Sequence, residues 1–426
     1  MKSTYWLAAA GLAALSTGAF AQSSTAQDGA KQPVYTPNTT MQTAQPGLPA
    51  QALPATVPSK VTLSGVVDLF VGSYKIGSSP NIMKLSDGGN SASLLVLSGS
   101  EDLGGGLRAN FLLDGGISAD TGAGTGNSAG GFAFSRQSYL GLEAPWGSVT
   151  AGKMYTPMFG ALYIADPFGM NQLNSPTMGL LPATGGQPGL ASNATTNPGN
   201  NMYFQARSAN SVRYTSPLTS PLVVDLSYAF GEVAGHNSQG SVVSGALGYK
   251  QPGKFYAAYA FQIQKSGGLG YGGAPTPAGS PTAVASPLTS TFQALVGSYN
   301  IMPTLKVGGS FIIDKVNDSV SPKAKFYQLG ATWDLPAASS SVLASFARRT
   351  VDNSSGFNQN AFTLGYNYYL SKRTSLYGRF VRYSNAGSNF GYAGYGGAVN
   401  PLGQPAASPS DNGAARALML GIRHAF

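Results

Sequence analysis

The chain consists largely of short segments in which apolar and polar residues alternate. The connections between these segments are alternately short and long. In residues 359–370, for example, Phe362 and Leu364 fall on one face and Thr363 and Asn367 on the other. Successive side chains of a β-strand point to opposite faces, so this alternation predicts strands that each have one apolar and one polar face. We therefore expect an all-β chain.

Sixteen such segments are expected to be strands. Their predicted ranges are 61–74, 91–101, 107–116, 132–144, 147–155, 203–216, 221–232, 241–250, 254–265, 290–300, 304–314, 324–334, 339–350, 359–370, 374–384 and 414–426. Tight connections such as 251–253 alternate with long ones such as 156–202, a pattern typical of outer-membrane barrels. An even number of strands lets the first and last pair antiparallel and leaves no open edge. The same strands could instead form a soluble β-sandwich.

The N-terminus favours export over a soluble sandwich in the cell interior. Lys2 precedes a short apolar run, Tyr5–Leu15, and Ala19–Ala21 has the small residues of a cleavage site, so residues 1–21 are expected to be a signal peptide. Residues 22–60 are rich in Pro, Thr and Ala without periodicity, which predicts a disordered or plug-like extension. Residues 61–426 would then be the barrel.

Composition excludes several classes of protein. Beyond the signal peptide, the chain has no run of 18 apolar residues, so helical membrane spans are not expected. Charged residues are only 10% of the chain, and 22 Tyr and 20 Phe argue against disorder. The formal net charge is +9, but the basic residues are scattered singly, so nucleic acid is not an expected partner.

Two motifs carry a resemblance to a known family. Residues 99–109 read G-S-E-D-L-G-G-G-L-R-A, a tight β-hairpin turn whose three glycines allow positive φ. The chain ends G-I-R-H-A-F, with Leu418, Leu420 and Phe426 on one face. Both motifs resemble those of general porins from Gram-negative outer membranes, especially of β-proteobacteria. The terminal Phe426 resembles the family's assembly signal.

The resemblance implies a transmembrane antiparallel barrel of about 16 strands, with the third loop folded into the lumen. It also implies a homotrimer that passes small hydrophilic solutes by passive diffusion. The implied partners are outer-membrane lipid and lipopolysaccharide, the barrel assembly machinery, and the diffusing solutes and anions. No cofactor is implied.

In this family, acidic side chains on the third loop face basic ones on the wall of the narrowest part of the pore. Asp166, in D-P-F-G, aligns with such an acid. Arg136, in F-S-R-Q, and Arg207, in R-S-A-N-S-V-R, resemble wall arginines. If Leu107, Ala109, Phe111 and Leu113 face lipid, Arg108 also points inward and is expected at the constriction, and the same alternation makes Arg379 a further inward candidate. Lys153 falls on the outer face, where the family makes a polar trimer contact.

The resemblance also has departures. Leu94 stands where the family usually carries Arg, and Val66 where some relatives carry Lys. After Asp166, the loop has no charged residue as far as residue 202. Arginines against a loop with so few acids predict a preference for anions, because charges act more strongly in a narrow constriction.

The residues offer little for enzyme chemistry. Cysteine is absent, and His236 and His424 are the only histidines, so we expect neither an enzyme nor a metal site. A membrane-embedded hydrolase would need a nucleophile–base pair that these histidines do not suggest. Two further interpretations stay open: a substrate-specific channel, which the long apolar third loop could shape, and a mainly structural or adhesive barrel.

Overall fold

The computed structural model describes most of the chain from residue 59 onward. The described ranges are 59–76, 80–125, 131–171, 174–181, 204–265, 288–317, 323–352, 358–384 and 414–426. The predicted signal peptide and the predicted extension as far as residue 58 lie outside these ranges. So do parts of the predicted long loop 156–202, nearly all of 266–289 and all of 385–413.

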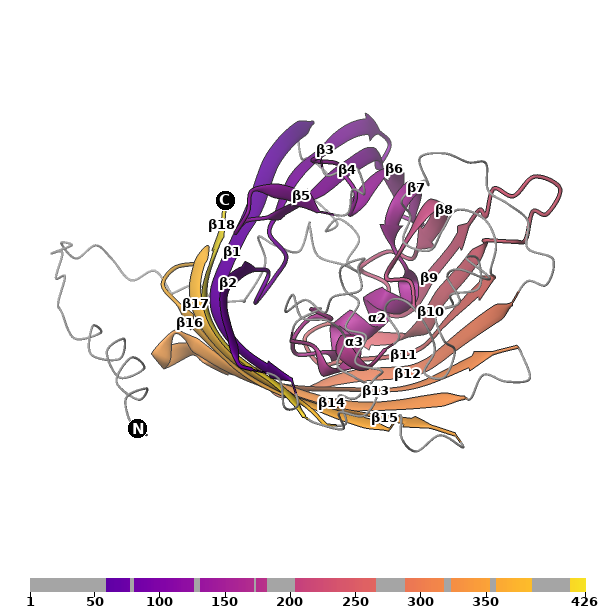
Figure 1. The fold of residues 1–426 in the computed structure, drawn as a ribbon. Helices are drawn as coiled ribbons and strands as arrows, with labels where there is room; N and C mark the ends of the chain where they lie inside the picture. The colour runs from indigo at the N-terminus through magenta and orange to yellow at the C-terminus, as the bar shows by residue number, and fades with distance from the viewer. Residues whose placement is uncertain are drawn as a thin grey trace, which may run out of the picture. The chain divides into compact units, whose positions relative to one another are not determined.

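The described residues form one antiparallel sheet of eighteen strands, of which β2 (Ile82–Asp87) and β5 (Ala123–Thr125) are short additions beside β1 and β4. The other sixteen (18 − 2) run round a closed ring, as the alternation predicts (Figure 1). They are β1 (Lys60–Ile76), β3 (Leu94–Gly104), β4 (Leu107–Ser118), β6 (Gln137–Ala144), β7 (Gly147–Tyr155), β8 (Arg207–Thr215), β9 (Leu222–Ala229), β10 (Val242–Gln251), β11 (Phe255–Lys265), β12 (Thr289–Met302), β13 (Leu305–Val316), β14 (Ala324–Leu335), β15 (Ser340–Val351), β16 (Gln359–Tyr369), β17 (Thr374–Tyr383) and β18 (Ala415–Ala425).

The first and last strands close the ring. Val66 of β1 pairs with Ala425 of β18, and the backbones of Gly65 and Phe426 exchange two hydrogen bonds of 3.1 Å each. The ring of Phe426 lies over Gly65, where no Cβ atom fits. Closure leaves no strand with a row of unpaired amides and carbonyls.

The two faces of the strands are as the sequence predicts. In β16, Phe362 and Leu364 are exposed on the outer face, whereas Thr363 and Asn367 are buried on the inner face. Two predicted strands begin later than expected: residues 132–136 precede β6, and residues 204–206 precede β8, without joining the sheet. In the described part of the chain, no helix combines the length and hydropathy needed to cross a membrane.

Two helices that the sequence analysis did not predict lie inside the ring of strands (Figure 1): α2 (Pro157–Ala165) and α3 (Pro176–Leu180). Each begins in the same way. Thr156 and Ser175 accept a hydrogen bond from a backbone amide of the first turn, and a proline follows at the first helical position. Both helices belong to the segment after β7.

Apolar side chains hold these helices against the inner wall. Met158 and Leu162 of α2 are fully buried, and they belong to one core cluster with Phe292 of β12 and Ile312 of β13. Helix α2 contacts β9 to β13, and α3 contacts β14 to β16. Part of the space within the barrel is therefore a packed hydrophobic core rather than an open lumen.

Candidate functional site

Two arginines converge on the hydroxyl group of Tyr155, the last residue of β7. Arg136 donates a hydrogen bond of 2.9 Å from Nη2 to the phenolic oxygen, and Arg207 donates to the same atom. The Arg207 guanidinium also lies 4.1 Å from the centroid of the Tyr155 ring, a cation–π contact. The two wall arginines predicted from separate strands are thus brought together.

The two guanidiniums differ in how far they are neutralised. The Nε of Arg136 lies 3.2 Å from both carboxylate oxygens of the buried Asp114. Arg207 takes part in none of the three ion pairs found among the described residues, and its Nε has no hydrogen-bond partner. The Arg207 guanidinium is therefore not offset by a carboxylate in any of these ion pairs.

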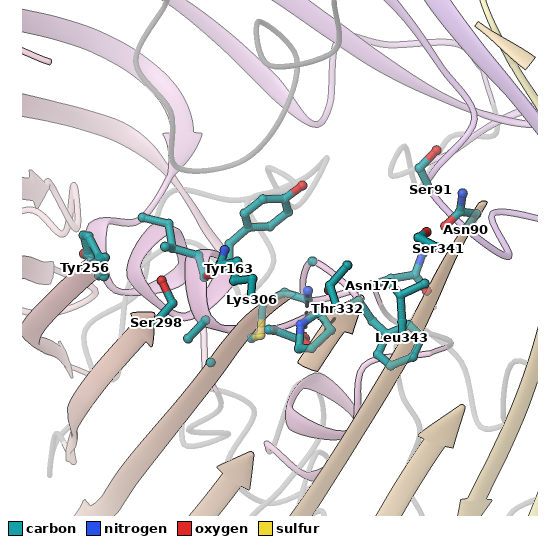
Figure 2. A pocket seen from close by; sticks show the side chains of 18 of the residues that line it. Asn90, Ser91, Tyr163, Asn171, Tyr256, Ser298, Lys306, Thr332, Ser341 and Leu343 are labelled. Atoms are coloured by element: carbon teal, nitrogen blue, oxygen red, sulfur yellow. Dashed lines mark hydrogen bonds between the residues drawn. The ribbon is translucent and has the colours of Figure 1, made fainter. Parts of the chain in front are cut away.

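Both arginines line a cavity of about 900 Å³ inside the barrel. Figure 2 shows Tyr163, Lys306 and Leu343 along this cavity, with Asn90 and Ser91 at its far side. Among the described lining residues, six are basic and three are acidic. The basic residues are Arg136, Arg207, Lys250, Lys254, Lys306 and Arg423, and the acidic residues are Asp87, Asp166 and Asp334.

Asp166 lines the cavity, but its carboxylate serves the loop that carries it. One oxygen accepts the backbone amide of Phe168 at 3.0 Å and the other that of Met170 at 2.9 Å. Burial raises the pKa of Asp166, while these amides oppose that rise. The acid that the sequence aligns with the constriction is therefore largely hidden from passing ions.

The segment after β7 is fixed to the inner wall by polar contacts at several points. Lys306 of β13 donates a 2.7 Å hydrogen bond to the carbonyl of Ile164, at the end of α2. Thr363 of β16 donates one of 2.7 Å to the carbonyl of Asn174. These bonds fix the segment to strands on the side of the barrel away from β3 and β4.

The same segment is also tied to the connection between β2 and β3. The side-chain amide of Asn171 donates a 3.0 Å hydrogen bond to the carbonyl of Gly88. That connection is itself held by Asp68 of β1, whose carboxylate accepts the amides of Asn90 at 2.9 Å and Ser91 at 2.7 Å. A continuous set of contacts therefore joins β13 and β16, the segment after β7, the connection between β2 and β3, and β1.

Two further arginines point inward, of which Arg423 lines the cavity and Arg379 is fully buried. Arg379 of β17 donates 2.6 Å hydrogen bonds to Asn90 and Asn367, and Arg423 of β18 donates one of 2.9 Å to Ser91. The sequence analysis gave Arg379 weak support and did not select Arg423. The alternation of β18 contained the signal for Arg423, because Leu418, Leu420 and Ile422 all face outward.

The remaining predicted residues lie apart from this group. Arg108 faces inward as predicted, but it sits near the turn after β3, paired across the strands with Asp102 and Glu143. Lys153 lies two residues before the end of β7 and is half-buried. Phe426 is half-exposed beside Gly65.

Val66 and Leu94, the two positions that depart from the resemblance, line the cavity directly. They pair across β1 and β3 and pack in a small apolar cluster with Val96 and Leu112. This part of the wall therefore carries no charge.

The described residues offer no group of three His, Asp or Glu side chains that could hold a metal ion.

Comparison with known proteins gives consistent results. Residues 8–388 match the family model for Gram-negative porins. Outer membrane porin protein 32 of Delftia acidovorans is 29% identical over 380 residues, covering 86% of this chain and 94% of that protein. An outer membrane porin protein of Bordetella pertussis is 27% identical over 372 residues, covering 78% of this chain and 81% of that protein. The solved structure of an anion-selective porin from Comamonas acidovorans superposes with a TM-score of 0.67 and 27% identity, covering 86% of this chain and all of that one.

Proposed function

This chain belongs to the family of Gram-negative porins and is an outer-membrane channel for small hydrophilic solutes, and we propose that its pore prefers anions. One observation carries the proposal. Arg207 and Arg136 meet at Tyr155 on the wall of the cavity, while Asp166, the acid of the loop, is engaged by backbone amides. An anion that enters the cavity meets positive charge that the Asp166 carboxylate does not offset.

The physical reason for the preference is the low dielectric of a narrow passage. A charge at the rim of a constriction with protein on several sides interacts with a passing ion more strongly than it would at a surface. Lys306 and Lys250 add positive charge along the same cavity. Passage remains passive, because binding strong enough to retain an ion would stop its flow. No chemical reaction is part of the proposal.

We propose that the described part of the segment after β7 narrows this passage and that Arg136, Arg207 and Asp166 lie at the constriction. Arg108, near the turn at one end of the barrel, belongs to the entrance instead. The support is the set of contacts that fix α2 and α3 to the inner wall and to the connection between β2 and β3.

Single-channel conductance in different salts tests the preference. We expect conductance to change little when lithium replaces potassium in the chloride salt, and to fall clearly when acetate replaces chloride in the potassium salt. The reverse pattern would show that cations carry the current and would refute the proposed preference.

For export and assembly, we propose that the chain behaves as the family does. We propose a signal peptide at residues 1–21, an extension at 22–60, and a homotrimer in which Lys153 lies at the contact. Outer-membrane lipid and lipopolysaccharide would cover the rest of the outer face, and the assembly machinery would recognise Phe426. Gel electrophoresis without heating tests the trimer, because a porin trimer migrates as one slow species that heating converts to monomer.

A further inference from the structure

The cavity has an uncharged side as well as a basic one. Tyr163, Ile164 and Pro167, at the end of α2 and just beyond it, line the cavity and are each partly exposed. None carries a charge, and Figure 2 shows the Tyr163 ring directed away from the strands that carry Ser298 and Thr332. A solute in the cavity therefore meets an apolar surface on the loop.

The Tyr163 ring packs close to the turn that follows it. Its Cε2 atom lies 2.9 Å from the position that a Cβ atom would take at Gly169. Gly169 also has a φ of 57°, a conformation in which a side chain is strained. The lack of a side chain at Gly169 therefore leaves room for the Tyr163 ring beside this turn.

A stacked and mostly buried pair of aromatic rings lies between the Arg207 guanidinium and α2. That group stacks on Tyr155 at 4.1 Å, and Tyr155 stacks on Phe159 of α2 at 4.8 Å between centroids. Tyr163 follows Phe159 by one helical turn, which places the two residues on the same face of α2. The Arg207 guanidinium and the partly exposed Tyr163 ring therefore line the same cavity, with the stacked pair Tyr155 and Phe159 between them in the sequence of contacts along α2.

We infer that the cavity favours organic anions that carry an aromatic or branched apolar body over small hydrophilic anions. The carboxylate lies against Arg207, and the apolar body lies over Tyr163 and Ile164. The volume of about 900 Å³ is within the range of about 300–1,000 Å³ that small-molecule sites occupy. This inference rests on the proposed anion preference and specifies which class of anion the cavity binds best.

The chemistry separates two kinds of anion. Chloride or acetate gains only the attraction of the basic wall. A benzoate ion gains that attraction and also removes its ring from water against Tyr163, and such ring contacts favour offset or edge-to-face packing. Benzoate should therefore stay in the cavity longer than acetate. While it is bound, it should measurably interrupt the current carried by smaller ions.

The experiment uses the full-length protein in a planar bilayer in potassium chloride, with benzoate or acetate added at equal ionic strength. We expect benzoate to interrupt the chloride current at about a tenfold lower concentration than acetate, which corresponds to the contribution of one aromatic contact. Tyr163→Ser should remove this difference, whereas the matched control Tyr163→Phe keeps the ring and should preserve it.

The outcomes separate the two proposals. A channel that prefers chloride over potassium but responds equally to benzoate and acetate overturns this inference and leaves the anion preference standing. The same holds if Tyr163→Ser and Tyr163→Phe behave alike. A channel that prefers potassium overturns the proposed preference, and the present inference with it.

Discussion

The backbone of Ala165 lies directly against Gly308 of β13, and a Cβ atom on Gly308 would collide with the Ala165 carbonyl group. The next residues of the loop make equally close contacts. A Cβ atom at Gly330 of β14 would lie 2.6 Å from Pro167, and one at Gly365 of β16 would lie 2.8 Å from the ring of Phe168. Inward glycines on three strands thus form the surface on which the end of α2 and the following turn rest.

Replacing Gly308 by Ala should push the loop away from the wall and into the passage. The collision is with backbone, which cannot rotate aside, so we expect a destabilisation of about 1–3 kcal/mol and a lower single-channel conductance. Gly297→Ala is the matched control, because its Cβ atom would meet only one backbone oxygen at 3.6 Å. Equal conductance in both variants would show that Gly308 does not set the loop position.

The buried ion pair of Arg213 and Asp225 should contribute far more to the free energy of unfolding than the exposed ion pair of Lys325 and Asp352. Arg213 Nε lies 2.7 Å from Asp225 Oδ1, and both side chains are almost fully buried. Asp225→Asn leaves the Arg213 charge without its partner, and we expect a loss of about 3–5 kcal/mol. The control, Asp352→Asn, breaks the exposed pair with Lys325 at 3.0 Å and should cost about 0–1 kcal/mol.

Thermal unfolding in detergent measures both losses. The double variant Arg213→Gln with Asp225→Asn removes both charges and should recover part of the stability lost in Asp225→Asn. If the single variant at Asp225 unfolds like the one at Asp352, the buried pair has no special role.

Phe426→Ala should separate folding from recognition by the assembly machinery. The two backbone hydrogen bonds between residues 65 and 426 do not depend on the ring, so the purified variant should still refold into detergent micelles. In cells, we expect a severalfold lower amount in the outer membrane, measured by membrane fractionation. Normal cellular levels would contradict the assembly role of Phe426, and failed refolding would show that the ring is needed for the fold itself.

The strands could be predicted because membrane barrels impose one simple pattern. Alternation places Asp68 and Arg108 on the inner face and Leu420 on the outer face, and the structure has all three there. The short strands β2 and β5 were missed because they lie in connections whose residues do not repeat the pattern over enough positions.

The alternation of side chains along a strand could not by itself have predicted that Arg136 and Arg207 point inward. Counted from the outward Leu140 and Leu142, Arg136 would point outward, yet it precedes the first residue of β6 and turns inward to Asp114. A register shift between Gly152 and Met154, opposite Ser208 to Ser211, interrupts the alternation next to Arg207. Both were selected by resemblance, and their meeting at Tyr155 could be seen only in the structure.

The role of Asp166 also depends on tertiary structure. Its alignment with an acid of the constriction says nothing about what its oxygens accept, and the amides that occupy them come from a turn that the sequence analysis did not predict. The two helices were missed for a related reason: their apolar residues show no helical periodicity, since nearly all sides are buried within the barrel.

The zero-current potential across a planar bilayer with a potassium chloride gradient tests the central claim most directly. For the wild type we expect the sign that indicates chloride as the main current carrier. Arg207→Gln should move the potential toward zero, whereas Arg382→Gln, on the exposed outer face of β17, should leave it unchanged. A wild-type potential of the opposite sign, or equal potentials in all three proteins, would contradict the account.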